Sequence, residues 1–406
     1  MTNLPQGWEV KKLGDIAEIQ IGKTPSRNNI DFFQGENIWL SIRDLKSKFV
    51  SSSSEKISNE AISKTNMKVV PKGTLLMSFK LTLGKTAFAE CDLYTNEAIA
   101  AIFIKNKNIN KYFLDYVLKF TDLEKYVDNA VKGKTLNKQK LKQIEILLPK
   151  NIKEQERIVG ILDESFAKID ESIKILEQDL LNLDELMQSA LQKAFNPLKD
   201  NVKENYKLPQ SWEWKSLGEI GEIITGTTPS KNNPNFYGNE YPLFKPSDLN
   251  GDIIIKYASD NLSKLGFDNA RNLPKDTILV VCIGASIGKV GLSGVNGSCN
   301  QQINAIIPNS AFTSKYLFFV CLSNYFQTIL KKNASQTTLP IINKTEFSKL
   351  QIPLPPLKEQ EQIASHLDEL SSHVKNLKQN YQAQIKDLQE LKNSLLDKAF
   401  KEIYKC

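Results

Sequence analysis

The chain has 406 residues, of which 41% are hydrophobic and 24% charged, so it is long enough for two or three domains with substantial cores. No run of 18 or more apolar residues occurs, which argues against a membrane-spanning helix, and the first 15 residues lack the apolar segment of a signal peptide. The five cysteines are scattered without a Cys-x-x-Cys pair, so we expect free thiols and a cytoplasmic protein.

The net charge of +7 is distributed unevenly along the chain. Residues 1–150 carry 24 Lys and Arg against 16 Asp and Glu, and residues 201–355 carry 15 against 11. The segment 151–200 between them is acidic, with 6 against 11. Two basic blocks separated by an acidic one favour a polyanionic partner for the blocks. A modest lysine excess that merely aids solubility explains the charge equally well.

The first predicted element is a globular domain over residues 1–150, in which short β-rich runs alternate with turns rich in Gly, Pro and Asn. The run from Glu145 to Pro149 is typical of a strand, and the run from Lys111 to Phe120 is typical of a short helix. We therefore predict an α+β (mixed α/β) fold for this domain.

A long helix is predicted next, in the segment 151–197. Its apolar residues advance by alternating steps of four and three, which is the heptad pattern of a coiled-coil seam. No Pro or Gly interrupts the chain from Ile161 to Asn196, and Pro197 ends the helix. The seam comprises Leu162, Phe166, Ile169, Ile173, Leu176, Leu180 and Leu183, and it continues through Met187, Ala190 and Ala194.

The segment 198–355 is predicted to hold a linker and a second domain that repeats the first. Leu208 to Asn233 matches Leu4 to Asn29 at 17 of 26 positions without a gap, and the repeat spacing is 204 residues. The correspondence continues through both domains and into the helices that follow them. The run from Thr277 to Gly284 is typical of a strand, so the second domain is also expected to be α+β.

A second long helix is predicted over residues 356–406, with small irregularities in its seam. Two such seams in one chain, joined through a domain, favour antiparallel pairing of the two helices with each other. Pairing of each helix with another chain is the alternative. The second seam comprises Leu367, Leu370, Val374, Leu377, Tyr381, Ile385, Leu388, Leu391 and Leu395.

The first helix has a length that suits a spacer between two DNA-binding domains. From Leu162 to Phe195 it contains 34 residues and would span about 50 Å, which equals roughly 15 base pairs of duplex DNA. The two domains differ in sequence outside their shared framework. We therefore expect them to recognise two different half-sites, which together form an asymmetric, bipartite target.

A set of short motifs occurs once in each half, in the same order. The members are Trp8 with Leu13-Gly14 and Trp212 with Leu217-Gly218; Gly22 to Arg27 and Gly226 to Lys231; Leu83-Gly84-Lys85 and Ile287-Gly288-Lys289; Asn96 and Asn300-Gln301; and Lys-Glu-Gln-Glu at 153–156 and at 358–361.

In this order and twice over, these motifs resemble the specificity subunit of Type I restriction–modification systems, over essentially the full length of the chain. The resemblance implies two target-recognition domains separated by two spacer helices, and binding to double-stranded DNA. It implies two methyltransferase (modification) subunits as partners and, in restriction complexes, two motor-endonuclease subunits. It also implies that this chain binds no cofactor, whereas S-adenosylmethionine, ATP and Mg belong to the partner subunits.

The residues themselves offer no catalytic constellation. The Gly-Lys pairs at 84–85, 133–134 and 288–289 lack the first glycine of a Walker A loop, because Phe79, Asp128 and Ile283 stand where that glycine is needed. No Asn-Pro-Pro-aromatic segment, as in adenine methyltransferases, is present. His366 and His373 have no further ligands at metal-binding spacing. We therefore expect a non-catalytic subunit.

The candidate DNA-binding residues are polar side chains in loops of the two domains, where Arg, Lys, Asn and Gln can read base edges and Ser, Thr and Lys can contact phosphates. The Thr-Pro-Ser loop, at 24–26 and at 228–230, is shared by both halves, so it is more readily explained as framework than as a base reader. Base-specific residues are then expected in the divergent stretches 30–60, 80–83 and 236–265. The candidates are Lys23, Thr24, Ser26, Arg27, Asn28, Arg43, Lys80, Lys85 and Lys134 in the first domain, and Thr228, Ser230, Lys231, Asn232, Lys245, Ser286, Lys289, Gln301 and Gln336 in the second.

Two alternative functions stay open on the sequence. The first is a specificity subunit of a methylation-only or Type IIB-like system, which the neighbouring genes would distinguish. The second is a coiled-coil scaffold that does not bind DNA, for which the helices alone would suffice. The duplicated basic domains argue against the scaffold, and a duplex-binding assay would decide between the two.

Overall fold

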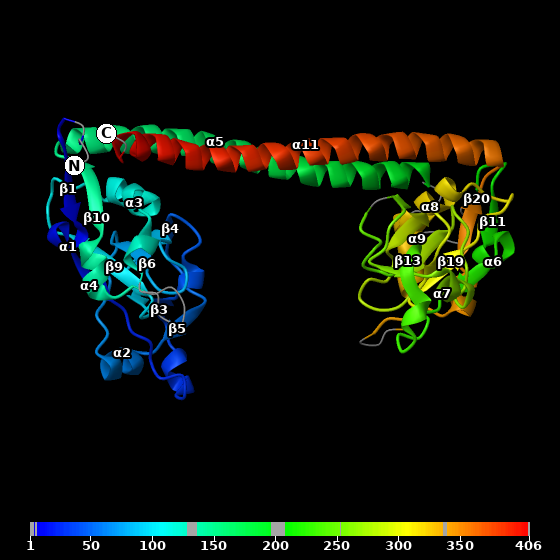
Figure 1. Ribbon diagram of the computed structural model, residues 1–406, viewed down its shortest axis with the longest axis horizontal. Helices are drawn as coiled ribbons and strands as arrows, with labels where there is room; N and C mark the ends of the chain where they lie inside the picture. The colour runs from blue at the N-terminus through cyan, green and yellow to red at the C-terminus, as the bar shows by residue number, and fades with distance from the viewer. Residues whose placement is uncertain are drawn as a thin grey trace. The chain divides into compact units, whose positions relative to one another are not determined.

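The computed structural model describes residues 4, 6–127, 136–195, 208–251, 253–335 and 339–404, and it divides into two similar units (Figure 1). The first unit comprises Met1–Ile175 and Gln384–Cys406, and the second comprises Leu176–Ala383. Each unit holds one α+β domain together with part of each of two long helices, α5 (Ile152–Ala194) and α11 (Leu357–Tyr404). The α+β fold expected from the sequence is confirmed. No helix within the described ranges is long and apolar enough to cross a membrane.

The domain of the first unit is built from short strands and short helices. Its helices are α1 (Leu13–Ile16), α2 (Asn59–Thr65), α3 (Lys111–Phe120) and α4 (Lys138–Gln143), with 3₁₀ turns η1 (Ile30–Phe33), η2 (Ile42–Asp44) and η3 (Leu123–Tyr126). Its strands are β1 (Trp8–Lys12), β2 (Ala17–Ile21), β3 (Asn37–Leu40), β4 (Phe49–Val50), β5 (Glu55–Ile57), β6 (Leu75–Ser78), β7 (Thr86–Ala89), β8 (Tyr94–Thr95), β9 (Ile99–Ile104) and β10 (Glu145–Pro149).

The domain of the second unit repeats the succession of strands, whereas its helices and 3₁₀ turns correspond only in part. Its helices are α6 (Leu217–Ile220), α7 (Lys264–Asp268), α8 (Ser314–Leu322), α9 (Asn324–Lys332) and α10 (Lys344–Ser348), with the 3₁₀ turn η5 (Pro234–Phe236). Its strands are β11 (Glu213–Ser216), β12 (Ile223–Thr225), β13 (Tyr237–Phe244), β14 (Ile254–Ile255), β15 (Asp260–Leu262), β16 (Ile278–Val281), β17 (Val290–Ser293), β18 (Ser298–Cys299), β19 (Ile303–Ile306) and β20 (Gln351–Leu354).

The strands of each domain form three sheets with the same order. In the first unit these are β1-β10, β2-β9-β6-β7-β4 and β5-β3-β8, and in the second they are β11-β20, β12-β19-β16-β17-β14 and β15-β13-β18. Pairing is antiparallel except for β4 with β7 and β3 with β8, and for their counterparts β14 with β17 and β13 with β18. The duplicated sequence therefore folds into a duplicated topology.

The five-stranded sheet of each domain is buried on both faces. Successive side chains of a strand point to opposite sides of the sheet, so neighbouring residues join different cores. Leu75 and Met77 of β6 join the core that includes Phe113 and Val117 of α3, whereas Leu76 joins a separate core on the other face. In the second unit Ile278 and Val280 pack with α8, and Leu279 and Val281 face the opposite side. The edge strands β2 and β12 of these sheets lead into the loops at 22–27 and 226–231.

A buried glutamine fixes the start of each long helix to its domain. The amide nitrogen of Gln155 donates to the carbonyl of Pro149 at 2.9 Å, and its amide oxygen accepts from the backbone N–H of Asn110 at 2.8 Å. Gln360 makes the same two contacts with Pro355 and Thr313, at 2.8 and 2.9 Å. Both side chains are buried. The Lys-Glu-Gln-Glu motif thus joins helix to domain.

A phenylalanine near the end of each long helix is inserted into a domain core. Phe400 of α11 packs against Phe113 and Phe120 in the first unit, with ring centroids 5.8 and 5.4 Å apart. Phe195, directly after α5, packs against Tyr316 in the second unit at 5.8 Å. Both phenylalanines end the same short sequence, Lys193-Ala194-Phe195 and Lys398-Ala399-Phe400. This repeated sequence therefore attaches the end of each helix to the domain that the other helix starts from.

Helices α5 and α11 pair antiparallel within each unit. In the first unit Lys392 of α11 donates to Asp170 of α5 at 2.5 Å, and in the second unit Lys378 of α11 donates to Asp184 of α5. Within the first unit, Ile158 and Leu162 of α5 line a pocket with Ala399 of α11, whereas Asp170 lies farther along α5 and pairs with Lys392, so the helices run in opposite directions. The intramolecular antiparallel pairing expected from the heptad patterns is confirmed.

The seam of α5 consists of the expected residues, whereas that of α11 differs. The residues Leu162, Phe166, Ile169, Ile173, Leu176, Leu180 and Leu183 of α5 are all buried or half-buried, and so are Leu367, Leu370, Val374, Tyr381, Ile385, Leu388 and Leu395 of α11.

Two of the residues expected in the second seam lie outside it. Leu377 and Leu391 are exposed at 39% and 45%, and the neighbouring Lys378 and Lys392 are half-buried in their place. With these lysines included, the seam of α11 advances by alternating steps of four and three from Val374 to Leu395. The prediction was wrong at these positions because it counted only apolar residues. A lysine can lay its aliphatic stem in a seam while its ammonium pairs with a carboxylate.

Candidate nucleic-acid interface

The Thr-Pro-Ser loop follows the edge strand β2 in the first domain and β12 in the second. It begins at Gly22 and Gly226, where the chain passes directly against the backbone of a neighbouring strand. A Cβ atom at Gly22 would lie 2.0 Å from the carbonyl oxygen of Thr95, and one at Gly226 would lie 2.2 Å from that of Cys299. Glycine is required at both positions because the backbone atoms that a side chain would meet cannot move aside.

A side-chain hydrogen bond closes each loop over its domain. The hydroxyl of Thr24 donates to the carboxylate of Glu97, and the hydroxyl of Thr228 donates to the amide oxygen of Gln301 at 2.8 Å. These pairs occupy equivalent positions in the repeat, and they explain why an acid or amide follows the shared asparagine. The structure thus brings three candidates, Thr24, Thr228 and Gln301, into framework contacts.

Lys23 also has a framework contact. Its ammonium donates to the carbonyls of Thr65 and Asn66, at 2.7 and 3.2 Å, where helix α2 ends. A cation at a helix C-terminus satisfies carbonyls that lack helical partners and interacts favourably with the helix dipole. Its expected contact with a DNA phosphate stays a prediction, but this contact gives the side chain a role in the fold.

Arg27 and Arg43 converge on one carboxylate in the first domain. Arg27 contacts Glu55 at 2.5 Å and Arg43 contacts the same carboxylate at 2.5 Å. The pKa of Glu55 lies below its ordinary value because it accepts a hydrogen bond from Arg27 and because both guanidinium groups carry positive charge. The two arginines are exposed, so the cluster presents ordered cations at the surface.

Lys231 and Lys245 converge on one carboxylate in the second domain. The ammonium of Lys245 donates to Asp260, and that of Lys231 lies 3.9 Å from the same oxygen. A hydrogen bond from Lys245, followed by the charges of both lysines, holds the pKa of Asp260 below its ordinary value. The second domain therefore repeats the arrangement of the first with lysines in place of arginines.

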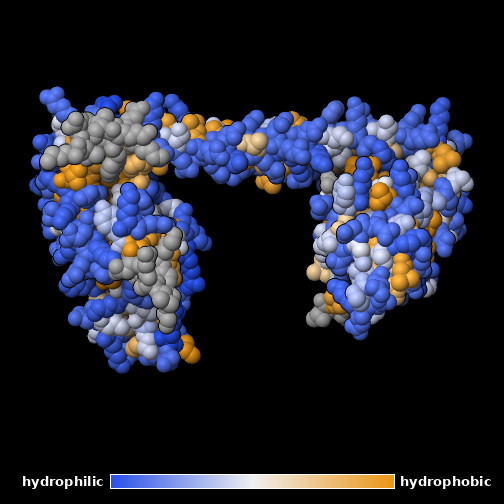
Figure 2. All heavy atoms as spheres, viewed as in Figure 1, coloured by the Kyte–Doolittle hydropathy of each residue, from blue (hydrophilic) through white to orange (hydrophobic). Residues whose placement is uncertain are grey.

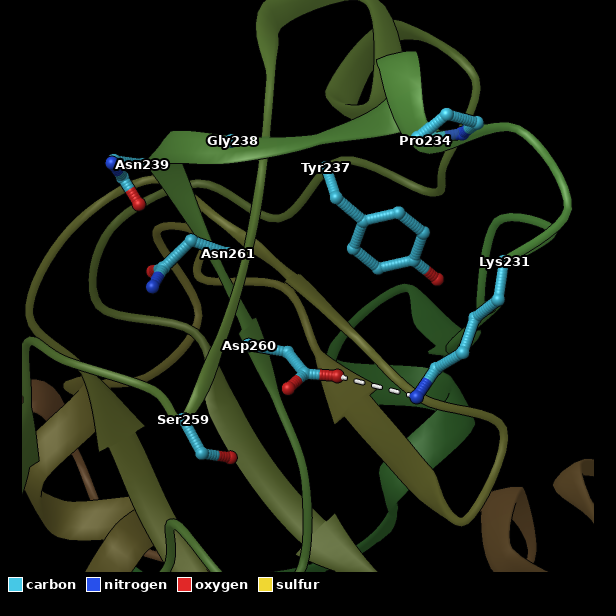
Figure 3. A pocket seen from close by; sticks show the side chains of 8 residues that line it. All are labelled: Lys231, Pro234, Tyr237, Gly238, Asn239, Ser259, Asp260 and Asn261. Atoms are coloured by element: carbon cyan, nitrogen blue, oxygen red, sulfur yellow. Dashed lines mark ion pairs between the residues drawn. The ribbon is translucent and has the colours of Figure 1, made fainter.

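An open polar pocket of about 450 Å³ adjoins the cluster of the second domain. Figure 3 shows Lys231 and Asp260 facing each other, with the ring of Tyr237 beside them and with Asn239 and Asn261 together at the other end. Tyr237 donates to the carbonyl of Pro229 at 2.7 Å and so ties the pocket to the Thr-Pro-Ser loop. The pocket offers donors, acceptors and an aromatic ring, which are the groups that contact nucleic-acid bases.

The turn between β6 and β7, and its counterpart between β16 and β17, carries four further candidates. Lys85 is exposed, and Lys80 is half-buried with its ammonium 5.8 Å from the ring centroid of Phe79. Lys289 is exposed and donates to the carbonyl of Pro246 at 3.3 Å, and the carbonyl of Ser286 accepts from the backbone N–H of Lys289 at 3.2 Å. None of these contacts involves Glu55 or Asp260.

The remaining candidates divide into exposed loop residues and residues that the structure does not describe. Ser26, Asn28, Ser230 and Asn232 are exposed, and Ser230 accepts from the backbone N–H of Asn232 at 3.3 Å. Lys134 and Gln336 lie outside the described residues. Within the described ranges, no group of three His, Cys, Asp or Glu side chains is arranged to hold a metal ion.

The sequence does not single out Glu55 and Asp260 as site residues, because a carboxylate repels a polyanion and is not expected to contact DNA directly. Both lie in the divergent stretches 30–60 and 236–265, where base-specific residues were expected. The difference in sequence between the two halves in these stretches is therefore the signal that points to Glu55 and Asp260.

Comparison with known proteins gives a consistent result. The model of the Type I restriction modification DNA specificity domain matches residues 5–180 and again residues 209–387. The chain is 25% identical to the Type I restriction enzyme MjaIX specificity subunit of Methanocaldococcus jannaschii over 97% of this chain and 93% of that protein. It is 34% identical to the HindI specificity subunit of Haemophilus influenzae over 42% of this chain and 38% of that protein.

A solved structure shares the fold over the same extent. It comes from work on complex assembly and conformational transition of the type I R-M system, and it superposes with a TM-score of 0.77 at 21% identity. The match covers 98% of this chain and 99% of that chain. The shared fold thus includes both domains and both long helices.

Proposed function

This chain belongs to the Type I restriction modification DNA specificity family, and from that membership we propose that its two domains read the two parts of an asymmetric, bipartite DNA sequence. It is a specificity subunit, the non-catalytic component of such a system. One observation carries the proposal. The two domains share the Gly, Thr, Pro and Ser residues of one loop framework, yet they differ in the exposed charged groups that this framework holds.

The shared framework accounts for a common mode of docking. Gly22, Thr24 and their counterparts Gly226 and Thr228 shape the same loop in both domains. The clusters beside that loop differ in chemistry, with guanidinium groups in one and ammonium groups in the other. Groups that position a protein on the DNA backbone carry no sequence information, whereas groups that differ between domains can distinguish bases. Two unlike half-sites follow from this division.

The direct test is the salt dependence of duplex binding by the full chain together with modification subunits. Lys231 is exposed and its ion pair with Asp260 is long, at 3.9 Å, so its ammonium can approach a phosphate as well. Lys231→Gln is expected to weaken binding on all sequences and to reduce the salt slope by about 1. Lys168→Gln, which removes an exposed charge from α5, is the matched control and leaves the slope unchanged. Equal slopes for the wild type and both variants would contradict the proposal.

We further propose that the chain assembles with two modification subunits, on grooves that the structure presents twice. Each groove is formed by α5 and α11 within one unit, with volumes of about 330 Å³ in the first and 560 Å³ in the second. The two grooves correspond at a spacing of 205 residues. Their matching members are Ile158, Ile161, Leu162, Ser165, Leu395, Lys398 and Ala399 in the first unit, and Ile363, His366, Leu367, Leu370, Ala190, Lys193 and Ala194 in the second.

The grooves suit a protein partner because apolar residues are exposed on the helices that form them. Ile161 is 51% exposed at the first groove and Leu186 is 48% exposed at the second. Figure 2 shows such apolar residues interrupting the otherwise polar surface of the helices. Exposed apolar residues beside polar ones are typical of protein–protein interfaces. Two equivalent grooves in one chain match two copies of one partner, which is what a duplicated specificity subunit requires.

Stoichiometry measured by native mass spectrometry tests the grooves. Ile161→Arg and His366→Arg stand at equivalent positions, and each is expected to reduce the bound modification subunits from two to one. The double variant is expected to bind none, because a charge in each groove would have to be desolvated on docking. Ile175→Arg, at a residue that is 55% exposed but lines neither groove, is the control. Two bound subunits in the double variant would show that partners dock elsewhere.

The partners would supply the chemistry. We propose that S-adenosylmethionine is bound by the modification subunits, and ATP and Mg by restriction or motor subunits, in the cytoplasm where the target DNA lies. Isolation of the complex from its host distinguishes a restriction complex from a methylation-only system, because only the former contains a motor-endonuclease subunit. Long-read methylation sequencing with and without this gene identifies the target.

A further inference from the structure

The clusters around Glu55 and Asp260 occupy the same place in the two domains. Glu55 is the first residue of β5 and Asp260 is the first residue of β15, and these strands pair with β3 and β13 in three-stranded sheets of the same order. Arg27 and Lys231 are 204 residues apart in the shared loop, which is the spacing of the repeat. The clusters therefore differ in their side chains and not in their position in the fold.

Arg27 acts as an anchor within the first cluster. Its two terminal nitrogens donate to the two oxygens of Glu55, at 2.5 and 3.0 Å, and its guanidinium lies 4.3 Å from the ring centroid of Phe33. Such a bidentate pair occupies the end edge of the guanidinium, which is one of the two edges able to bind guanine. The end edge of Arg27 is therefore occupied by Glu55, and this side chain joins the carboxylate to the loop.

Arg43 is held at its side edge and is open at its end edge. Its Nε donates to the hydroxyl of Ser41 at 3.2 Å and its Nη2 donates to Glu55 at 2.5 Å. Its Nη1 has no hydrogen-bond partner in the part of the chain that the structure describes, and the side chain is 60% exposed. A guanidinium that is fixed on one side and open on the other is a preorganised pair of donors, because little rotamer entropy remains to be lost on binding.

The second cluster offers no such planar pair. Lys245 is only 25% exposed and its ammonium is held by Asp260, whereas Lys231 is 73% exposed. An ammonium group is a point charge on a flexible stem and does not match two acceptors in a fixed plane. The difference between the clusters is therefore a difference in the number and the geometry of free donors.

We propose that Arg43 reads a guanine in the half-site of the first domain, with Nη1 and Nη2 donating to O6 and N7, and that Glu55 orients it for this contact. Guanine is the base whose major-groove edge presents two acceptors at the spacing of a guanidinium, and this pairing is the commonest specific contact between proteins and DNA. The inference rests on the proposed function and names one specificity-determining side chain for it.

The test uses the full chain with its modification subunits and duplexes based on its methylated sequence. Replacing the guanine that Arg43 reads by adenine, as a G·C to A·T change, is expected to weaken binding by the wild type roughly 5- to 150-fold. 7-Deazaguanine, which lacks the N7 acceptor, locates that guanine without altering the protein. Arg43→Lys keeps the charge but loses the planar pair, so it is expected to bind both duplexes alike and to methylate a motif relaxed at that one position.

Two further variants separate specificity from folding. Glu55→Gln keeps the guanidinium of Arg43 but weakens the hydrogen bond that orients it. The variant is therefore expected to lower affinity for the cognate duplex without changing the motif. Lys231→Gln, in the second domain, is expected to weaken binding to both duplexes equally, so the ratio of the two affinities stays that of the wild type. A methylated sequence without guanine in either half-site, or an unchanged motif with Arg43→Lys, would overturn the inference while the proposed function stands. A wild-type complex that binds no duplex would overturn the proposed function itself.

Discussion

Gly22 and Gly226 are single residues on which the loops of the two candidate interfaces depend. A methyl group at either position would meet a backbone carbonyl at 2.0 or 2.2 Å, and the strand that carries the carbonyl is part of a sheet. We expect Gly22→Ala and Gly226→Ala each to lower the free energy of unfolding by about 1–3 kcal/mol, the range of overpacked cores. Chemical denaturation of the variants, followed by circular dichroism, measures the change.

Gly160 provides the control for these glycines. It lies inside α5 and a Cβ atom there would have no neighbour within 4 Å. Gly160→Ala is therefore expected to stabilise the protein by about 0.5–1 kcal/mol, because alanine loses less backbone entropy in a helix. Loss of stability in all three variants alike would mean that close approach is not what requires glycine in the loops.

At the level of elements, Gln155 and Gln360 are expected to control how firmly each long helix is attached to its domain. Truncation to alanine removes the acceptor of the Asn110 or Thr313 amide, and a buried donor without a partner costs about 1–3 kcal/mol. We expect Gln155→Ala to accelerate hydrogen exchange at the amide of Asn110, and Gln360→Ala to do so at Thr313. Gln188→Ala, at an exposed position of α5, is expected to leave both rates unchanged.

The pairing of the two helices is also set at this scale. Lys378 and Lys392 replace apolar residues in the seam, and each meets an aspartate of α5. Polar residues in a seam reduce stability but fix the register and the identity of the partner helix. This explains why the two seams of one chain pair with each other in one register.

At the level of the whole molecule, we propose that the paired helices determine the separation of the half-sites. Helix α5 is 43 residues long, which corresponds to a length of about 65 Å. Inserting three heptads after Glu177, and three after Gln384 on α11, preserves both seams and adds about 32 Å, which is close to one turn of duplex DNA. We expect the methylated motif to keep both half-sites and to gain roughly 9–10 base pairs between them.

An insertion of one heptad in each helix is the counterpart of this experiment. It adds about 10 Å, or roughly 3 base pairs, which turns the second half-site about a third of the way around the duplex. We expect this variant to lose methylation, because the second domain would face the wrong side of the DNA. A methylome with the original gap in either variant would contradict the proposed role of the helices as a spacer.

The sequence by itself determined the repeat, the α+β class, the two long helices and the shared loops. These features follow from patterns that can be read along the chain, namely a 204-residue correspondence, heptad spacing and glycines at fixed offsets. Such patterns do not depend on contacts between distant parts of the chain. The sequence also located divergence in 30–60 and 236–265, where the clusters lie. It did not reveal that Glu55 joins Arg27 and Arg43, because opposite charges far apart in the chain have no visible relation until strands pair.

Only the tertiary structure decided which polar residues are framework and which present free donors. Lys23 and Arg43 are both exposed basic residues, yet the ammonium of Lys23 is engaged by helix carbonyls, whereas the guanidinium of Arg43 keeps an open edge. The placement of Lys392 in the seam was decided in the same way, since Asp170 of the other helix makes a lysine tolerable there. In each case the physical reason is that the role of a charge depends on its partners, and folding brings those partners together.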